Sequence, residues 1–172
     1  MKKWLAVAAA IGSVTACGGD GGPTAPTAPA NIAASYAATV TASSTCSANL
    51  PNETRALDFL ANITQTGAAV QVQLIAHVPG VPEITFSGTV AGQAVSFPSF
   101  SFNQAMGRGA ALAASGNANV AANGLSITGT LNGTYQTSSG ASCNATNHQI
   151  QMVKLCSQPT ATGTAMLPCQ GI

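Results

Sequence analysis

Apolar and polar residues alternate with period two over most of the chain beyond residue 34. Successive side chains of a β-strand point to opposite faces, so this period predicts strands that bury one face and expose the other. The first five such segments cover residues 36–42, 57–63, 70–74, 84–90 and a stretch that begins at Val95. The turn signal Gly92-Gln93 lies between the last two, which we expect to form a hairpin.

The second half of the chain continues the pattern less regularly. Residues 108–122 are predicted as a sixth strand, because their glycines and asparagines weaken the helical turn that Gly-Ala-Ala-Leu-Ala-Ala would otherwise suit. Asn123-Gly124 is a strong hairpin signal before a long strand over 125–135. The alternation passes through Asn132-Gly133 without a phase slip, so glycine there eases curvature instead of making a turn. An eighth strand is expected from about Asn147 to Leu155.

Together these segments predict an all-β fold. Strands that follow one another closely favour an antiparallel up-and-down meander of about eight strands. We expect it to close as a small barrel, with a β-sandwich as the alternative. Cys169 is then placed in a C-terminal tail that contains Pro159 and Pro168.

The first sixteen residues have the three parts of an export signal. Lys2 and Lys3 give a positive start, Trp4 to Ile11 form a short apolar stretch, and small residues follow. The apolar stretch is shorter than the ~20 residues that a membrane-spanning helix needs. We therefore expect residues 1–16 to be a signal peptide, whose removal leaves about 155 residues, a length that suits one domain.

The end of this signal, Val14-Thr15-Ala16-Cys17, resembles the lipobox of bacterial lipoproteins. The resemblance implies that the Cys17 thiol is acylated and becomes the first residue, which anchors the protein to a bilayer. A Gly- and Pro-rich stretch over 17–34 is then a tether, and 35–172 is a single barrel-like domain. The lipid-anchored protein would lie in the bacterial cell envelope. Gly18 stands where an aspartate retains enterobacterial lipoproteins at the inner membrane, so we expect the outer membrane.

Apart from Cys17 the chain holds four cysteines, which in an oxidising compartment predict two disulfides. In a closed eight-stranded meander the first and last strands are neighbours, so the end of the first, with Cys46, lies beside Cys143. Cys156 lies at the other end of the last strand, about ten residues of ~3.4 Å rise away. We therefore predict Cys46 with Cys143 and Cys156 with Cys169. The sequence contains no Cys-x-x-Cys pair, so its cysteine spacing does not favour a metal site over two disulfides.

Charge is scarce in this sequence. With the signal removed, three cations remain against four carboxylates: Arg55, Arg108 and Lys154 against Asp20, Glu53, Asp58 and Glu83. Three dispersed cations make no basic stripe, so nucleic acid is disfavoured as a partner.

Candidate chemistry is sparse, and we predict no catalytic residue, no metal and no cofactor. His77 and His148 have no metal-ligand spacing, and each is interpreted as a solvated or hydrogen-bonded residue at a strand end. Nucleophile-elbow and phosphate-loop motifs are missing from the sequence. Two groups are candidate positions for a ligand cavity or its polar entrance, the charged Glu53, Arg55 and Asp58 and the aromatic Phe86, Phe97 and Tyr135. An exposed ion-pair cluster and a packed barrel core are the simpler interpretations of these groups.

In overall pattern the exported domain resembles small envelope lipoproteins with a calycin-like or lipocalin-like barrel. The lipocalin Gly-x-Trp signature is absent, so no ligand residues follow from this resemblance. Our first hypothesis is a non-catalytic module that binds a small apolar ligand or another envelope component. The alternatives are a structural or adhesive surface protein, and an enzyme that acts on envelope polysaccharide or peptide.

Overall fold

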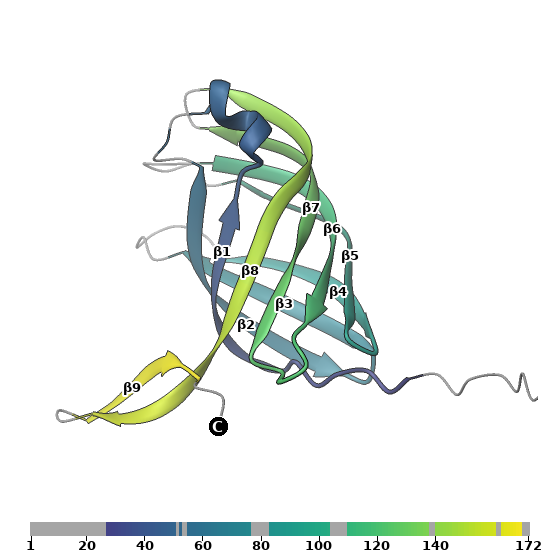
Figure 1. Ribbon diagram of the computed structural model, residues 1–172, viewed down its shortest axis with the longest axis vertical. Helices are drawn as coiled ribbons and strands as arrows, with labels where there is room; N and C mark the ends of the chain where they lie inside the picture. The colour runs from purple at the N-terminus through teal and green to yellow at the C-terminus, as the bar shows by residue number, and fades with distance from the viewer. Residues whose placement is uncertain are drawn as a thin grey trace, which may run out of the picture.

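The computed structural model describes residues 27–50, 52, 55–76, 83–103, 110–137, 140–160 and 163–169. Most of these residues lie in strands, as the alternation predicts (Figure 1). The elements are β1 (Ala34–Thr41), the short 3-10 helix η1 (Ser44–Ala48), β2 (Ala56–Thr66), β3 (Ala69–Ala76), β4 (Ile84–Ala91), β5 (Ala94–Asn103), β6 (Ala110–Val120), β7 (Ser126–Thr137), β8 (Ser142–Thr160) and β9 (Gly163–Pro168).

Strands β1 to β8 form a closed antiparallel barrel. Each strand pairs with the next along the chain, and β1 also pairs with β8, from Tyr36 opposite Lys154 to Thr41 opposite Gln149. The strands are staggered around the barrel. A path that starts at a residue of β1 and steps from each residue to its cross-strand partner returns to β1 about ten residues further along. This stagger requires the strands to tilt against the barrel axis. The predicted meander is confirmed, and the sandwich alternative is wrong because the β1–β8 pairing leaves no open edge between these strands.

The inward positions of the strands build one apolar core. Tyr36, Phe59, Leu74, Leu112 and Leu131 are among its fully buried side chains. The weakly signalled sixth segment is indeed a strand, and β7 continues through Asn132-Gly133 as one strand. Its glycines are sterically required: a Cβ on Gly133 would lie 1.9 Å from the carbonyl oxygen of Ala113. Without side chains at these glycines β7 packs closely against the backbone of β6, which a Cβ would push away.

Two β-bulges interrupt the alternation. Between Phe97 and Phe100, β5 has one residue more than β6, and Pro98 lies in the bulge. β8 has one residue more than β7 between Ala145 and His148. In each bulge two consecutive residues are exposed, so the inward phase of the strand shifts by one residue.

The two ends of the barrel differ. We call the end that carries η1 and the start of β8 the η1 end, and the opposite end, where β1 begins, the entry end. The backbone N–H of Ala30 donates to the carbonyl of Gly92 at the entry end, and that of Ile32 to Gln65 Oε1. Ile32 is buried and its carbonyl accepts a bond from the Tyr36 hydroxyl. Residues 30–33, which the sequence assigned to the tether, thus pack onto the barrel.

Beyond the barrel, β8 continues and pairs with β9 in a two-stranded ribbon. Pairing runs from Leu155 opposite Pro168 to Thr160 opposite Gly163, and these residues, 155–160 and 163–168, are called the ribbon. It projects from the entry end (Figure 1). The prediction that the last strand runs from Asn147 to Leu155 before a tail was therefore wrong at both ends. Proline argues against an interior strand, but a two-stranded ribbon is all edge and accepts Pro159.

Candidate functional site

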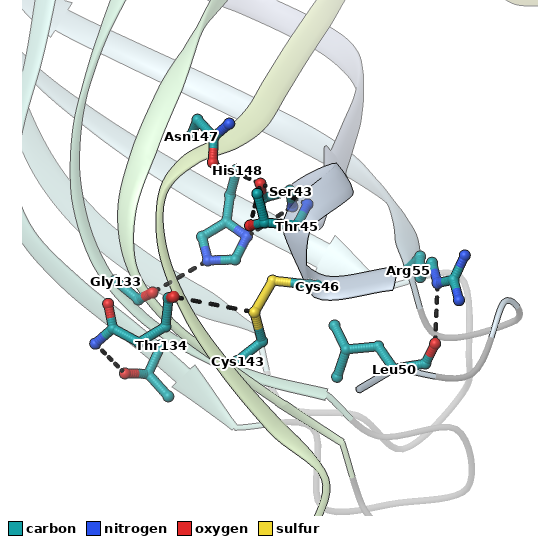
Figure 2. The surroundings of a disulfide bond; sticks show 11 residues. Ser43, Thr45, Cys46, Leu50, Arg55, Gly133, Thr134, Cys143, Asn147 and His148 are labelled. Atoms are coloured by element: carbon teal, nitrogen blue, oxygen red, sulfur yellow. Dashed lines mark hydrogen bonds between the residues drawn. A yellow bond between two sulfur atoms is a disulfide. The ribbon is translucent and has the colours of Figure 1, made fainter. Parts of the chain in front are cut away.

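Polar side chains gather at the η1 end of the barrel, some buried in its wall and some exposed, next to the disulfide Cys46–Cys143 (Figure 2). Ser43 and His148 are the two buried polar residues among those whose burial the structure describes. Ser43 immediately precedes η1 on the chain, and His148 comes from β8. We call Ser43, Thr45, Asn147 and His148 the polar cluster.

His148 joins two backbone groups of different strands. The backbone N–H of Ser43 donates to its Nδ1 over 3.0 Å. Because a backbone N–H can only donate, Nδ1 is the acceptor and the ring proton is on Nε2, which lies 3.1 Å from the carbonyl oxygen of Gly133. The imidazole thus links the end of β1 to β7 across the bulge in β8, and its ring lies 5.8 Å from that of Tyr135.

The hydroxyl of Ser43 is engaged elsewhere. It donates to Asn147 Oδ1 over 2.5 Å and accepts from the N–H of Thr45 at 3.2 Å, which caps the start of η1. It makes no bond to His148, whose accepting nitrogen holds the Ser43 backbone. A general base needs a free lone pair that faces the proton it removes. These contacts therefore make the polar cluster a structural network, and no buried side-chain nitrogen or oxygen among the described residues lacks a partner.

Sequence reasoning missed this cluster. It placed His148 at the opening of the last strand, whereas the residue lies inside β8 and is fully buried. The signal is present in the sequence, because apolar Ala145 and Ile150 are five positions apart and cannot share one face of an unbroken strand. A bulge at Thr146 and Asn147 turns His148 inward. His77, the other histidine, lies outside the described residues.

Both predicted disulfides are present. Cys46 and Cys143 have Cα atoms 5.6 Å apart, and their bridge connects the helix after β1 to the start of β8. Cys156 and Cys169, with Cα atoms 5.1 Å apart, close the base of the ribbon. The first bridge spans 97 residues of sequence and the second spans 13. Cys17 lies outside the described residues, so its acylation stays a prediction.

Of the charged candidates, Arg55 and Asp58 lie among the described residues, and the polar entrance stays a prediction. Arg55 Nε donates to the Leu50 carbonyl over 2.9 Å. Asp58 is exposed on the outer face of β2, where its Oδ1 accepts a bond of 2.6 Å from the Thr39 hydroxyl. Glu53 lies outside the described residues.

The aromatic candidates are core side chains. Phe86 stacks on Phe100 with ring centroids 4.5 Å apart and meets Phe97 edge-on at 5.4 Å. Tyr135 is fully buried on another part of the wall, and burial raises its pKa well above the usual value. Burial also raises the pKa of the Tyr36 hydroxyl. All three aromatic candidates are buried, and a ligand cavity lined by them stays a prediction.

Two hollows open on the described surface, and the candidate residue Arg55 lines one of them. A depression of about 720 Å³ at the entry end is lined by Thr27, Ala30 and Gly92, and one of about 480 Å³ at the η1 end by Ser43, Arg55 and neighbours. Both are open and shallow. Among the described residues no three metal-ligating side chains lie together. No helix of the described part of the chain has the length and apolar character needed to cross a membrane.

Fold and side chains define a small closed antiparallel β-barrel with a filled core and two disulfides. Comparison with protein-family models, with curated proteins and with solved structures finds no match for this chain.

Proposed function

We propose that this protein is a non-catalytic module of the bacterial cell envelope, anchored to a membrane by acylated Cys17, that contacts another envelope component through the outer wall of its barrel. The anchor rests on the lipobox resemblance of Val14 to Cys17 and on the Gly- and Pro-rich stretch that follows. Two disulfides are consistent with an oxidising compartment.

The observation that carries the contact is an uncharged polar surface over a filled core. Across the outer wall Thr39 lies opposite Gln151, Gln151 opposite Thr128, and Thr128 opposite Asn119. A second row runs alongside it through Thr41, Gln149, Thr130, Asn117 and Ser96. We call these two rows the neutral wall.

The neutral wall favours a partner that offers many uncharged hydrogen-bonding groups. Its hydroxyls and amides both donate and accept, and the charged Asp58, opposite Thr39 on β2, lies at its edge and is already bound by the Thr39 hydroxyl. An apolar ligand inside the barrel is the weaker candidate, because inward side chains such as Tyr36, Phe59 and Leu131 occupy the interior. The same wall would serve a structural or adhesive protein, in which the partner is another copy of the chain.

In-cell photo-crosslinking tests the proposal. A photoreactive residue replaces Thr128 in the neutral wall, and the control replaces Asn62 on the outer face of β2. We expect adducts of defined mass from position 128 and few from position 62. Equal background adducts at both positions would contradict a wall contact, and adducts between two copies would favour the structural alternative.

Intact mass spectrometry of protein purified from membranes tests the anchor separately. The expected N-terminus is Cys17 with an added acyl mass. An unmodified N-terminus would show that the anchor is wrong, and a stoichiometric small molecule released from the folded barrel would favour the ligand-binding alternative.

A further inference from the structure

The ribbon exposes apolar side chains on both of its faces. Met166 is 50 % exposed and Leu167 is 42 % exposed, and within the described part of the chain these are the large hydrophobic side chains left exposed. Neighbours along a strand point to opposite faces, so each face carries one of them. The Ser157 hydroxyl, across the ribbon, lies 3.5 Å from Met166 Sδ.

The ribbon and the N-terminal segment leave the barrel at the same end. The bond from Ala30 to Gly92 holds the N-terminal segment to the entry end. Lys154, just before the ribbon, donates its backbone N–H to Leu125, which precedes β7 at that end. Figure 1 shows both the ribbon and the N-terminal segment at the foot of the barrel, away from η1.

The charges of the described residues divide between the two ends. Asp58 near the start of β2, Glu83 just before β4 and Arg55 lie in the half toward the η1 end, and Lys154 lies at the base of the ribbon. Residues 156–169 contain no charged residue. An anionic bilayer facing the entry end would therefore attract Lys154 and meet no carboxylate of the described residues.

We propose that the ribbon is immersed in the interfacial layer of the bilayer, so that Met166 on one face and Leu167 on the other both lie among the headgroups, and that the η1 end is directed away from the membrane. The proposal rests on acylation of Cys17, which precedes Thr27 by ten residues and so holds the entry end within about 35 Å of the bilayer. The unpaired edge groups of a two-stranded ribbon need water, so the ribbon stays among the headgroups and does not enter the hydrocarbon.

A single tryptophan reports this contact. Trp4 is the only tryptophan of the chain and lies in the predicted signal, so the mature Met166→Trp variant has one indole. Its matched control is Ala48→Trp, on an exposed position of η1 at the other end of the barrel. Each full-length acylated protein is reconstituted in vesicles of phosphatidylcholine and phosphatidylglycerol, with or without brominated acyl chains. Far-ultraviolet circular dichroism shows that both variants fold.

We expect bromine to quench the indole at position 166 at least about threefold more than the one at position 48, because an interfacial side chain is buried by ~5–10 Å. If both variants float with the vesicles but their indoles are quenched equally, the ribbon contact is overturned and the anchor is left intact. Failure to float, or a Cys17 without acyl mass, would overturn the anchor and this proposal with it. The protein could also form a dimer in detergent that the double substitution Met166→Ser and Leu167→Ser dissociates. The ribbon would then contact a second copy of the chain, and the proposal would be overturned.

Discussion

At the scale of single residues, His148 is the side chain whose loss should cost the most. Its two ring nitrogens satisfy the N–H of Ser43 and the carbonyl of Gly133, both at the η1 end. Replacement by alanine leaves these groups without their partner and opens a cavity in the wall. We expect His148→Ala to lower the free energy of unfolding by about 4 kcal/mol.

Urea unfolding measures this loss, and Gln149→Ala is the matched control. Gln149 is the exposed neighbour on the same strand, so its truncation should change stability by less than about 0.5 kcal/mol. A loss at His148 no larger than at Gln149 would show that the two hydrogen bonds contribute little.

The two tyrosines predict how stability depends on alkaline pH. Tyr36 and Tyr135 are the only tyrosines, and burial raises the pKa of both above the ordinary 10.0. Above pH 10 the unfolded chain loses phenolic protons that the folded chain keeps, so stability is full below this pH and falls as pH rises further. Absorbance of tyrosinate at 295 nm should appear together with unfolding, followed by circular dichroism. Ionisation near pH 10 in a still folded barrel would contradict this expectation.

At the scale of elements, the glycines of β7 should be irreplaceable while those of the turns should not. A Cβ on Gly129 would lie 2.2 Å from the Asn117 oxygen, and backbone cannot move aside cheaply. Gly67, in the β2–β3 turn, has open space where a Cβ would lie. An alanine there would be strained only by the positive φ of 60°. We expect Gly129→Ala to cost about 3 kcal/mol and Gly67→Ala about 1 kcal/mol, measured by urea unfolding. Equal costs would mean that the β6–β7 contact relaxes easily.

The elements also show what the sequence can and cannot reveal. Alternation identified most of the barrel strands because each buries one face, and turn residues such as Gly92 and Gly124 marked hairpins. The bulge before His148 was missed because a single extra residue interrupts the period-two alternation only locally, and such an interruption cannot be told from an ordinary irregularity of the pattern. The ribbon was missed because its strands have no buried face and contain proline, so neither signal of a strand applies to them. The polar cluster depends on that bulge, and it was missed for the same reason.

At the scale of the whole molecule, the two disulfides should stabilise different units. Cys46–Cys143 closes a loop of 97 residues across the β1–β8 seam, whereas Cys156–Cys169 closes 13 residues in the ribbon. Replacing the first pair by serine should lower global stability by about 4 kcal/mol, since the unfolded chain gains the freedom of a long loop. Replacing the second pair should leave the unfolding of the barrel nearly unchanged and raise hydrogen exchange in the ribbon alone. Similar global losses for both pairs would show that ribbon and barrel unfold as one unit.

The pairing of β1 with β8 also determines when the molecule can fold. Tyr36 lies opposite Lys154, so the barrel cannot close until the chain as far as β8 is available for pairing. Contacts so distant in sequence form slowly. Until then the hydrogen-bonding edge of β1 is unpaired and open to association with other chains. A chaperone that protects this edge, or the speed at which β8 becomes available, would therefore decide how much protein reaches its native state.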